Sequence, residues 1–203
     1  MDRLGHPRPK ARQSARIVSS ESAASGRIDF DDLQSTHRYR FVAAYAQSKL
    51  AKLLFAQELA RRAHFTGVCV GSFAAHPGVA KSNIFVDKQG EWGRSRRGME
   101  SVVRFAQMLL AQSAAKGALP ALYQATDPAA RSADYVGPSE GKRGYPGVQK
   151  IPRAALDTHT AARLWDVSCE LAGVEYEFAE EAPHKPHAAT NAMIGRNWEP
   201  DEV

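Results

Sequence analysis

The amino-acid sequence predicts an α/β fold built on a doubly wound parallel sheet, and two observations support this expectation. Short apolar runs of strand length recur along the chain, and the run at 68–75 (VCVGSFAA) consists of small and β-branched residues, as in a strand covered on both faces. Ahead of it, residues 42–62 contain no glycine or proline and are rich in helix-forming residues. Alternating strand and helix signals are typical of parallel sheets.

The first predicted strand covers residues 16–20 (RIVSS), an apolar run that ends in small polar residues and therefore delivers a hydroxyl at its carboxyl end. The polar segment 21–41 is expected to be a connection, and it contains no cofactor motif. The helix predicted at 42–62 has an apolar face with helical spacing. That face consists of Ala46, Leu50, Leu53 and Leu54.

The second predicted strand, at 68–75, is followed by the turn sequence HPG at 76–78. Residues 81–98 mix basic residues with glycines and show no sustained period, which indicates a loop or lid. Helices are then predicted at 99–112 and at 116–125, where a proline lies inside the second pattern.

A short third strand is predicted at 135–138, and glycine and proline dominate the following segment, 137–147. Asp157 is a suitable N-cap for a helix that ends near Leu171. Residues after Phe178 lack apolar periodicity and are expected to be disordered.

The composition is that of an ordinary globular chain of 203 residues, with 43% hydrophobic and 24% charged residues. No run approaches the roughly 18 apolar residues of a membrane-spanning helix, and the start lacks an apolar signal region, so we expect a cytoplasmic protein without a membrane span. The net charge of +5 comes mainly from the N-terminal end, which lacks aromatic residues for base stacking, so nucleic acid is not expected as a partner. Cys69 and Cys169 lie in apolar patterns and are expected to be buried free thiols.

Candidate chemistry centres on Tyr45 and Lys49, which are four residues apart and therefore project from one face of the predicted helix. A phenol has a pKa of about 10 in water, and a nearby cation favours its ionised form. Such a tyrosine can act as a general acid toward a carbonyl oxygen or as a general base toward an alcohol. Ser20, at the end of the first strand, could hydrogen-bond the same oxygen. The alternative is a packed tyrosine beside a solvated lysine, because this spacing is common in helices.

Four segments of the chain together resemble the short-chain dehydrogenase/reductase family, particularly its retinol-dehydrogenase-like branch. They are RIVSS (16–20), DFDDLQS (29–35), YAQSKLAKLLFAQELARR (45–62) and AAHPGVAKS (74–82). The resemblance runs from about residue 16 to 178 and implies the C-terminal part of a Rossmann-like sheet that lacks its N-terminal strands. Residues 1–15 are then a basic, irregular arm, 16–178 a partial catalytic domain and 179–203 a disordered acidic tail.

The resemblance also implies roles for individual residues in an NAD(P)-dependent interconversion of an alcohol and a carbonyl compound. Ser20 would polarise the substrate oxygen, Tyr45 would transfer the proton, and Lys49 would hold the nicotinamide ribose. The implied cofactor-binding residues are Tyr45, Lys49, Pro77, Gly78 and Ser82.

Several neighbouring residues compete for these roles. Ser19 and Ser22 are rival serines, but Ser20 matches the retinol-dehydrogenase-like spacing without a gap. His76 is expected to be a structural residue before the turn and not a catalytic base. The histidines in HKPH (184–187) lack a carboxylate or thiol framework, so no metal is expected.

The chain departs from the family pattern at its beginning, where members carry a glycine-rich turn that binds the cofactor pyrophosphate. Only nineteen residues precede Ser20, and they include a single glycine, Gly5. We therefore expect a truncated chain, whose sequence does not indicate whether NAD or NADP is the cofactor. The alternative function is an inactive remnant or a non-catalytic interaction module. The expected partners are a small alcohol or carbonyl substrate and a second copy bound through helix 42–62.

Overall fold

The computed structural model describes residues 13–80, 111–176 and 178. The elements are β1 (Gln13–Val18), η1 (Glu21–Ser25), α1 (Phe41–Phe65), β2 (Val70–Ala75), α3 (Ala114–Thr126), β3 (Tyr135–Pro138), β4 (Pro146–Val148), η3 (Arg153–Leu156) and α4 (Thr158–Ala172), where η marks a 3-10 helix. The loop predicted at 81–98, nearly all of the helix predicted at 99–112 and the tail predicted at 179–203 lie outside the described residues.

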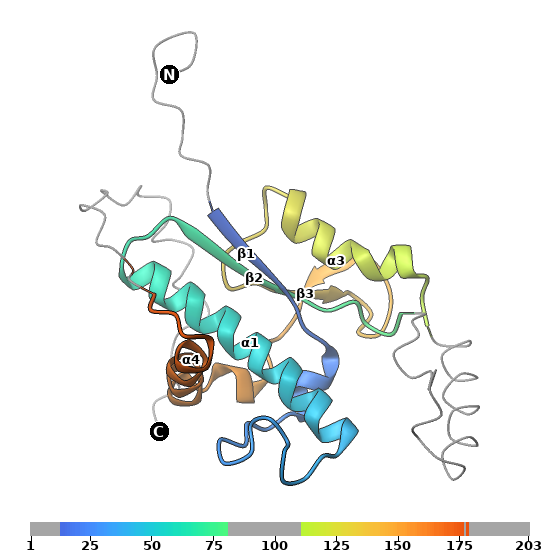
Figure 1. Ribbon diagram of the computed structural model, residues 1–203. Coiled ribbons are helices and arrows are strands. Elements are labelled where there is room, and N and C mark those ends of the chain that lie inside the picture. The colour runs from blue at the N-terminus through green and yellow to red at the C-terminus, as the bar shows by residue number, and fades with distance from the viewer. Residues whose placement is uncertain (1–12, 81–110, 177, 179–203) are drawn as a thin grey trace, which may run out of the picture.

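The four strands form one sheet in the order β1-β2-β3-β4. The pairs β1-β2 and β2-β3 are parallel, and β3-β4 is antiparallel. Helix α1 covers one face with α4 packed beside it, and α3 covers the other face (Figure 1). This arrangement confirms the predicted α/β fold with helices on both sides of a mainly parallel sheet. Within the described residues, β1 forms an edge and pairs only with β2.

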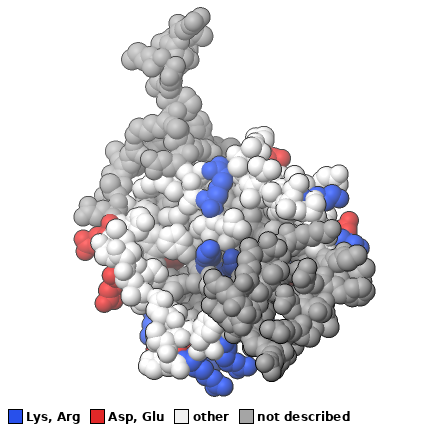
Figure 2. Space-filling model, turned by 45° about the vertical axis from the view of Figure 1, so that its right-hand side comes forward, with Lys and Arg blue, Asp and Glu red and all other residues white. Residues whose placement is uncertain are grey.

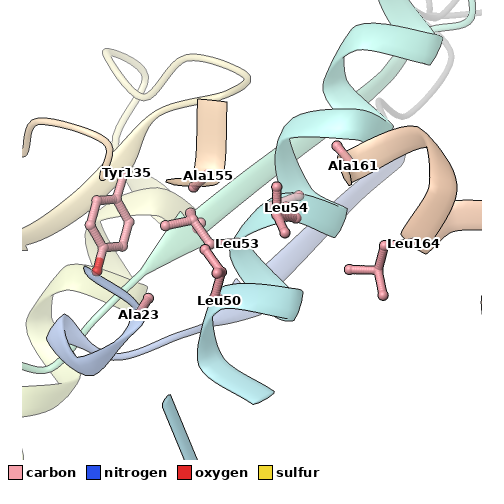
Figure 3. Packing of buried hydrophobic residues seen from close by; sticks show 10 residues of the cluster. Ala23, Leu50, Leu53, Leu54, Tyr135, Ala155, Ala161 and Leu164 are labelled. Carbon is pink, nitrogen blue, oxygen red and sulfur yellow. The ribbon is translucent and has the colours of Figure 1, made fainter. Parts of the chain in front are cut away.

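The hydrophobic core lies between α1, the sheet and α4, as the close view in Figure 3 shows. Leu50, Leu53 and Leu54 are at most 2% exposed, which confirms the predicted apolar face of this helix. The core also contains Tyr135 from β3 and Ala23 from η1, so it reaches the carboxyl ends of the parallel strands.

The predicted first strand was misplaced by two or three residues. β1 runs from Gln13 to Val18, so its first three residues come from the expected arm at 1–15, and the two serines lie beyond its end. Polar Gln13 pairs with Val70 because a strand ladder is made by main-chain groups, which apolar patterning does not report. The strand β4 was not predicted, since its three residues lie in a segment rich in glycine and proline.

The second strand begins at Val70, two residues later than predicted, and this changes the environment of Cys69. Both cysteines are free thiols, as expected, but Cys69 is exposed and Cys169 is only half-buried. The prediction of buried thiols was therefore wrong, because Cys69 lies just outside the sheet.

The helices near the C-terminal end follow their sequence signals. Asp157 caps α4 by accepting hydrogen bonds from the main-chain nitrogens of His159 (3.0 Å) and Thr160 (3.1 Å). Gly173 ends the helix with a left-handed φ of 63°. Pro120 is buried inside α3, which continues through it.

A buried carboxylate on α1 holds two arginines of the same helix, one of which contacts α4. Glu58 is 1% exposed and accepts hydrogen bonds from the Nε atoms of Arg61 (2.7 Å) and Arg62 (2.6 Å). The Arg62 guanidinium also lies 4.8 Å from the ring centroid of Trp165 on α4. Burial alone would raise the pKa of Glu58, but the hydrogen bonds and charges of the two arginines hold it below its usual value.

Basic side chains occupy several separate groups on the face in Figure 2, with acidic side chains near its margins. Among the described residues, no helix combines the length and apolarity that crossing a membrane requires.

Candidate active site

One helical turn of α1 brings Tyr45 and Lys49 together. The Lys49 Nζ atom lies 5.2 Å from the centroid of the Tyr45 ring, and both side chains are half-buried. Phe41, one turn earlier, stacks on Tyr45 with 6.2 Å between the ring centroids. The predicted shared face is therefore present, with a cation beside the phenol.

The two serines after β1 have different surroundings. Ser19 is 2% exposed, and its Oγ donates a 2.8 Å hydrogen bond to the main-chain oxygen of Lys49. Its main-chain nitrogen also donates to Ala75 in β2 (2.7 Å). Ser19 therefore joins the end of β1 to both α1 and β2, and its hydroxyl proton is already committed.

Ser20 is the half-buried N-cap of η1. Its Oγ accepts a 3.3 Å hydrogen bond from the main-chain nitrogen of Ser22 and donates a 3.4 Å bond to that residue's hydroxyl. The Ser20 hydroxyl thus donates only a long bond to a neighbouring side chain, which a closer acceptor on a ligand could replace. Of the three rival serines, Ser20 combines this weakly held hydroxyl with a position directly beside the Ser19 link to Lys49.

The turn after β2 lies at the same edge of the sheet. β1 and β2 are parallel and in register from Gln13 with Val70 to Val18 with Ala75, so their carboxyl ends meet. This edge is where open parallel α/β sheets bind ligands. Strand pairing thus brings Ser20 and the turn at 76–78 to the same edge of the sheet, although they are far apart in the sequence.

Gly78 has a left-handed φ of 63°, and a side chain there would overlap the main-chain oxygen of Lys142. Its nitrogen donates a 3.3 Å hydrogen bond to Nδ1 of His76. The preceding Pro77 oxygen accepts a 2.8 Å bond from Nε2 of Gln112. The backbone at 77–78 is held from both sides and only glycine fits at its second position.

His76 is 4% exposed, and its imidazole fills the space where Gly137 has no side chain. Burial lowers its pKa, against a smaller opposing effect of the Glu21 carboxylate. A buried, neutral imidazole packed on the sheet agrees with the expected structural role.

Sequence reasoning missed Tyr135, whose hydroxyl donates a 3.3 Å hydrogen bond to the main-chain oxygen of Ser20. No local signal could have found this contact, since the two residues are 115 positions apart. Within the described residues, no hydrogen bond joins Ser20 Oγ directly to Tyr45 Oη. Ser82 lies outside the described residues.

The residues present fit one end of a nicotinamide dinucleotide. Lys49 can donate to ribose hydroxyls, and hydrogen bonds hold the backbone at Pro77 and Gly78 beside the same edge. For the pyrophosphate the fit fails, because no two of the 15 glycines are two residues apart, as a glycine-rich dinucleotide turn requires. The described residues contain no group of three metal-ligating side chains.

Comparison with known proteins identifies relatives, although no family model matches the chain. Human retinol dehydrogenase 12 is 35% identical over 175 residues, which are 84% of this chain and 49% of that protein. Human retinol dehydrogenase 13 is 38% identical over 184 residues, covering 86% of this chain and 50% of the relative. The bovine (Bos taurus) dehydrogenase/reductase SDR family member 13 is 34% identical, covering 83% and 42%.

A solved structure is also similar, that of an uncharacterized protein from Mycobacterium paratuberculosis. It superposes with a TM-score of 0.61 at 31% identity and covers 81% of this chain and 52% of the other. The chain thus spans about half the length of the curated relatives it matches.

Proposed function

This chain belongs to the short-chain dehydrogenase/reductase family, and from that premise we propose that Ser20, Tyr45 and Lys49 form its catalytic site. The activity is NAD(P)-dependent interconversion of an alcohol and a carbonyl compound. The observation that supports the proposal is the contact between helix α1 and the segment after β1. Lys49 lies beside the Tyr45 ring on α1, and the hydrogen bond from Ser19 to the Lys49 backbone holds the Ser20 segment against the same helix.

In carbonyl reduction, the Tyr45 hydroxyl gives its proton to the substrate oxygen, and in alcohol oxidation it takes that proton back. The Ser20 hydroxyl donates a hydrogen bond to the same oxygen, where negative charge develops. Lys49 lies beside the phenol ring, where its ammonium group can donate hydrogen bonds to the cofactor ribose. The bound nicotinamide cofactor supplies or accepts the hydride.

The proposed cofactor contacts are Tyr45, Lys49, Pro77, Gly78 and Ser82. They hold the nicotinamide end of the cofactor, and the pyrophosphate needs donors that this sequence does not supply. The chain alone is therefore expected to show no micromolar affinity for NAD or NADP, measured by calorimetric titration. Tight binding of either nucleotide would contradict this part of the proposal.

The alternative function, a remnant or interaction module without nucleotide binding, is favoured by one observation. A groove of about 450 Å³ lies between β1, α1 and α4, and its lining combines apolar side chains such as Ile17 and Phe55 with the charged Arg16 and Lys52. Val18 on the same strand is 50% exposed. An edge strand with apolar surroundings is a surface for pairing with another segment.

An experiment on a completed protein separates the two functions. In this completed protein, residues 13–203 follow the N-terminal portion of human retinol dehydrogenase 13 that the chain does not cover. We expect it to reduce aldehydes with NADH or NADPH, and Tyr45→Phe to lower turnover by about 10²–10⁴-fold because the transferable proton is deleted. The control is Tyr145→Phe, a tyrosine that is 75% exposed. Full turnover in the Tyr45 variant would refute the catalytic assignment, and a folded but inactive completed protein would favour the interaction module.

A second copy of the chain is proposed to pack against α1, which exposes Val42 (75%) and Phe65 (74%) to solvent. Sedimentation should show a dimer that Val42→Glu weakens. A cytoplasmic location also stays a proposal.

A further inference from the structure

A buried phenol supports the backbone of the proposed catalytic serine. Tyr135 is 3% exposed, and its hydroxyl donates to the main-chain oxygen of Ser20 at 3.3 Å. Figure 3 shows the phenol reaching from its strand toward the segment that carries Ala23 in η1. Among the described contacts, this is the hydrogen bond that ties Ser20 to β3.

The ring of Tyr135 is held in place on its own strand. Its backbone pairs with Ala74 of β2, and the His76 imidazole packs on it with 5.0 Å between the ring centroids. Because Gly137 has no side chain, the imidazole fits over the backbone of β3 and cannot move away from the phenol without opening a void. The position of the hydroxyl is therefore set by the sheet.

The hydroxyl of Tyr135 is a permanent donor. Burial raises its pKa to about 12, and the Glu21 carboxylate acts in the same direction. The proton thus stays on the phenol at all physiological pH values, and Tyr135 does not compete with Tyr45 for proton transfer. The role left to this hydroxyl is to donate a hydrogen bond to a fixed acceptor.

The acceptor is the main-chain carbonyl oxygen of Ser20 itself. This oxygen also accepts a 3.0 Å bond from the Ala23 main-chain nitrogen, which closes the first turn of η1. The two donors together restrain the backbone of Ser20, and this limits the positions that its Cβ and hydroxyl can reach. Small misplacements of a catalytic group are costly, since an error of about 1 Å can lower turnover by about 10²-fold.

We propose that Tyr135 is a positioning residue that acts through Ser20: its hydrogen bond to the Ser20 carbonyl aims the Ser20 hydroxyl at the substrate oxygen. This inference rests on the proposed function of Ser20. Tyr135 is 3% exposed, and we assign it no contact with substrate or cofactor. A phenol that serves only as core packing would contribute equally whether or not Ser20 carries a hydroxyl.

A double-mutant cycle in the completed protein distinguishes these roles. Tyr135→Phe keeps the ring and its packing but removes the donor, and we expect kcat to fall about 10- to 100-fold with an unchanged KM for the cofactor. In a Ser20→Ala background the same substitution should cause no further loss, because the group it aims is already absent. The control Tyr145→Phe should have no effect in either background. An equal loss in both backgrounds would overturn the proposal.

Amide hydrogen exchange on the 203-residue chain tests the contact without any activity. Tyr135→Phe should speed exchange of the Ala23 amide about five-fold, as expected for the loss of one hydrogen bond on the shared oxygen, while amides in α4 keep their rates. Unchanged exchange at Ala23 would overturn the positioning role. An inactive completed protein combined with faster Ala23 exchange would instead refute the proposed function and leave the contact established.

Discussion

The division of labour between Ser19 and Ser20 can be tested by removing each hydroxyl in turn. Ser19→Ala deletes the 2.8 Å hydrogen bond that the Ser19 hydroxyl donates to the main-chain oxygen of Lys49. Ser19 is buried, with 2% of its surface exposed. Lys49 lies inside α1, so its oxygen keeps a helical partner one turn later and is not left unpaired. The loss is therefore that of one ordinary buried hydrogen bond, about 1 kcal/mol of unfolding free energy.

A loss of this size lowers the melting temperature by about 2–4 °C for a chain of this length. Ser20→Ala removes the acceptor that caps a 3-10 helix of five residues and should cost about 0.5–1 kcal/mol. The two variants are thus similar in stability. Their turnover in the completed protein should differ, since only Ser20→Ala deletes a donor to the developing oxyanion and should lower kcat by about 10²–10³-fold.

The measurements are a thermal unfolding curve for each 203-residue variant and kcat for each completed protein, taken well below the melting temperature. Ser19→Ala should keep kcat within about ten-fold of the parent, because it shifts the helix only slightly. A folded Ser19 variant that loses as much turnover as the Ser20 variant would refute the assignment. An unchanged melting temperature for Ser19→Ala would refute the structural role given to its hydrogen bond.

Three further predictions concern stability. Glu58→Gln removes the buried charge between two arginines and should lower the unfolding free energy by about 1–3 kcal/mol at neutral pH. The pKa of Glu58 lies below its usual value of 4.5, so this contribution is present above that pH and is lost in acid, where urea unfolding curves of variant and parent should converge. Gly78→Ala should lower the melting temperature more than Gly141→Ala: both glycines have left-handed φ angles (63° and 78°), but of the two only Gly78 has other atoms within 4 Å of an added side chain. Equal decreases in melting temperature would show that backbone conformation alone matters. Burial lowers the pKa of His76 from 6.5, so its contribution to stability is present above that pH and decreases as the pH falls below it; His76→Asn should show a smaller decrease between neutral and mildly acidic pH, and an unchanged pH profile would contradict this.

Local patterns in the sequence were sufficient to predict much of the helical structure. The α1 helix, the burial of Leu50, Leu53 and Leu54, and the cap at Asp157 were all expected, because each depends on residues within one or two turns of each other. The same reason made the shared face of Tyr45 and Lys49 predictable, since an i, i+4 spacing needs no knowledge of the rest of the fold.

Only the tertiary structure decided what depends on distant partners. The strand β1 begins at a polar residue because β2 offers main-chain groups to pair with, and no pattern within residues 13–18 reports that neighbour. Ser19 and Ser20 are identical in chemistry and adjacent in sequence, yet one bonds to Lys49, 30 residues away, and the other does not. The support of Ser20 by Tyr135 spans 115 residues and exists because β2 lies between their strands. Hydrogen bonds of this kind are specified by the packing of whole elements, so the sequence alone indicates which groups are available but not which pairs they form.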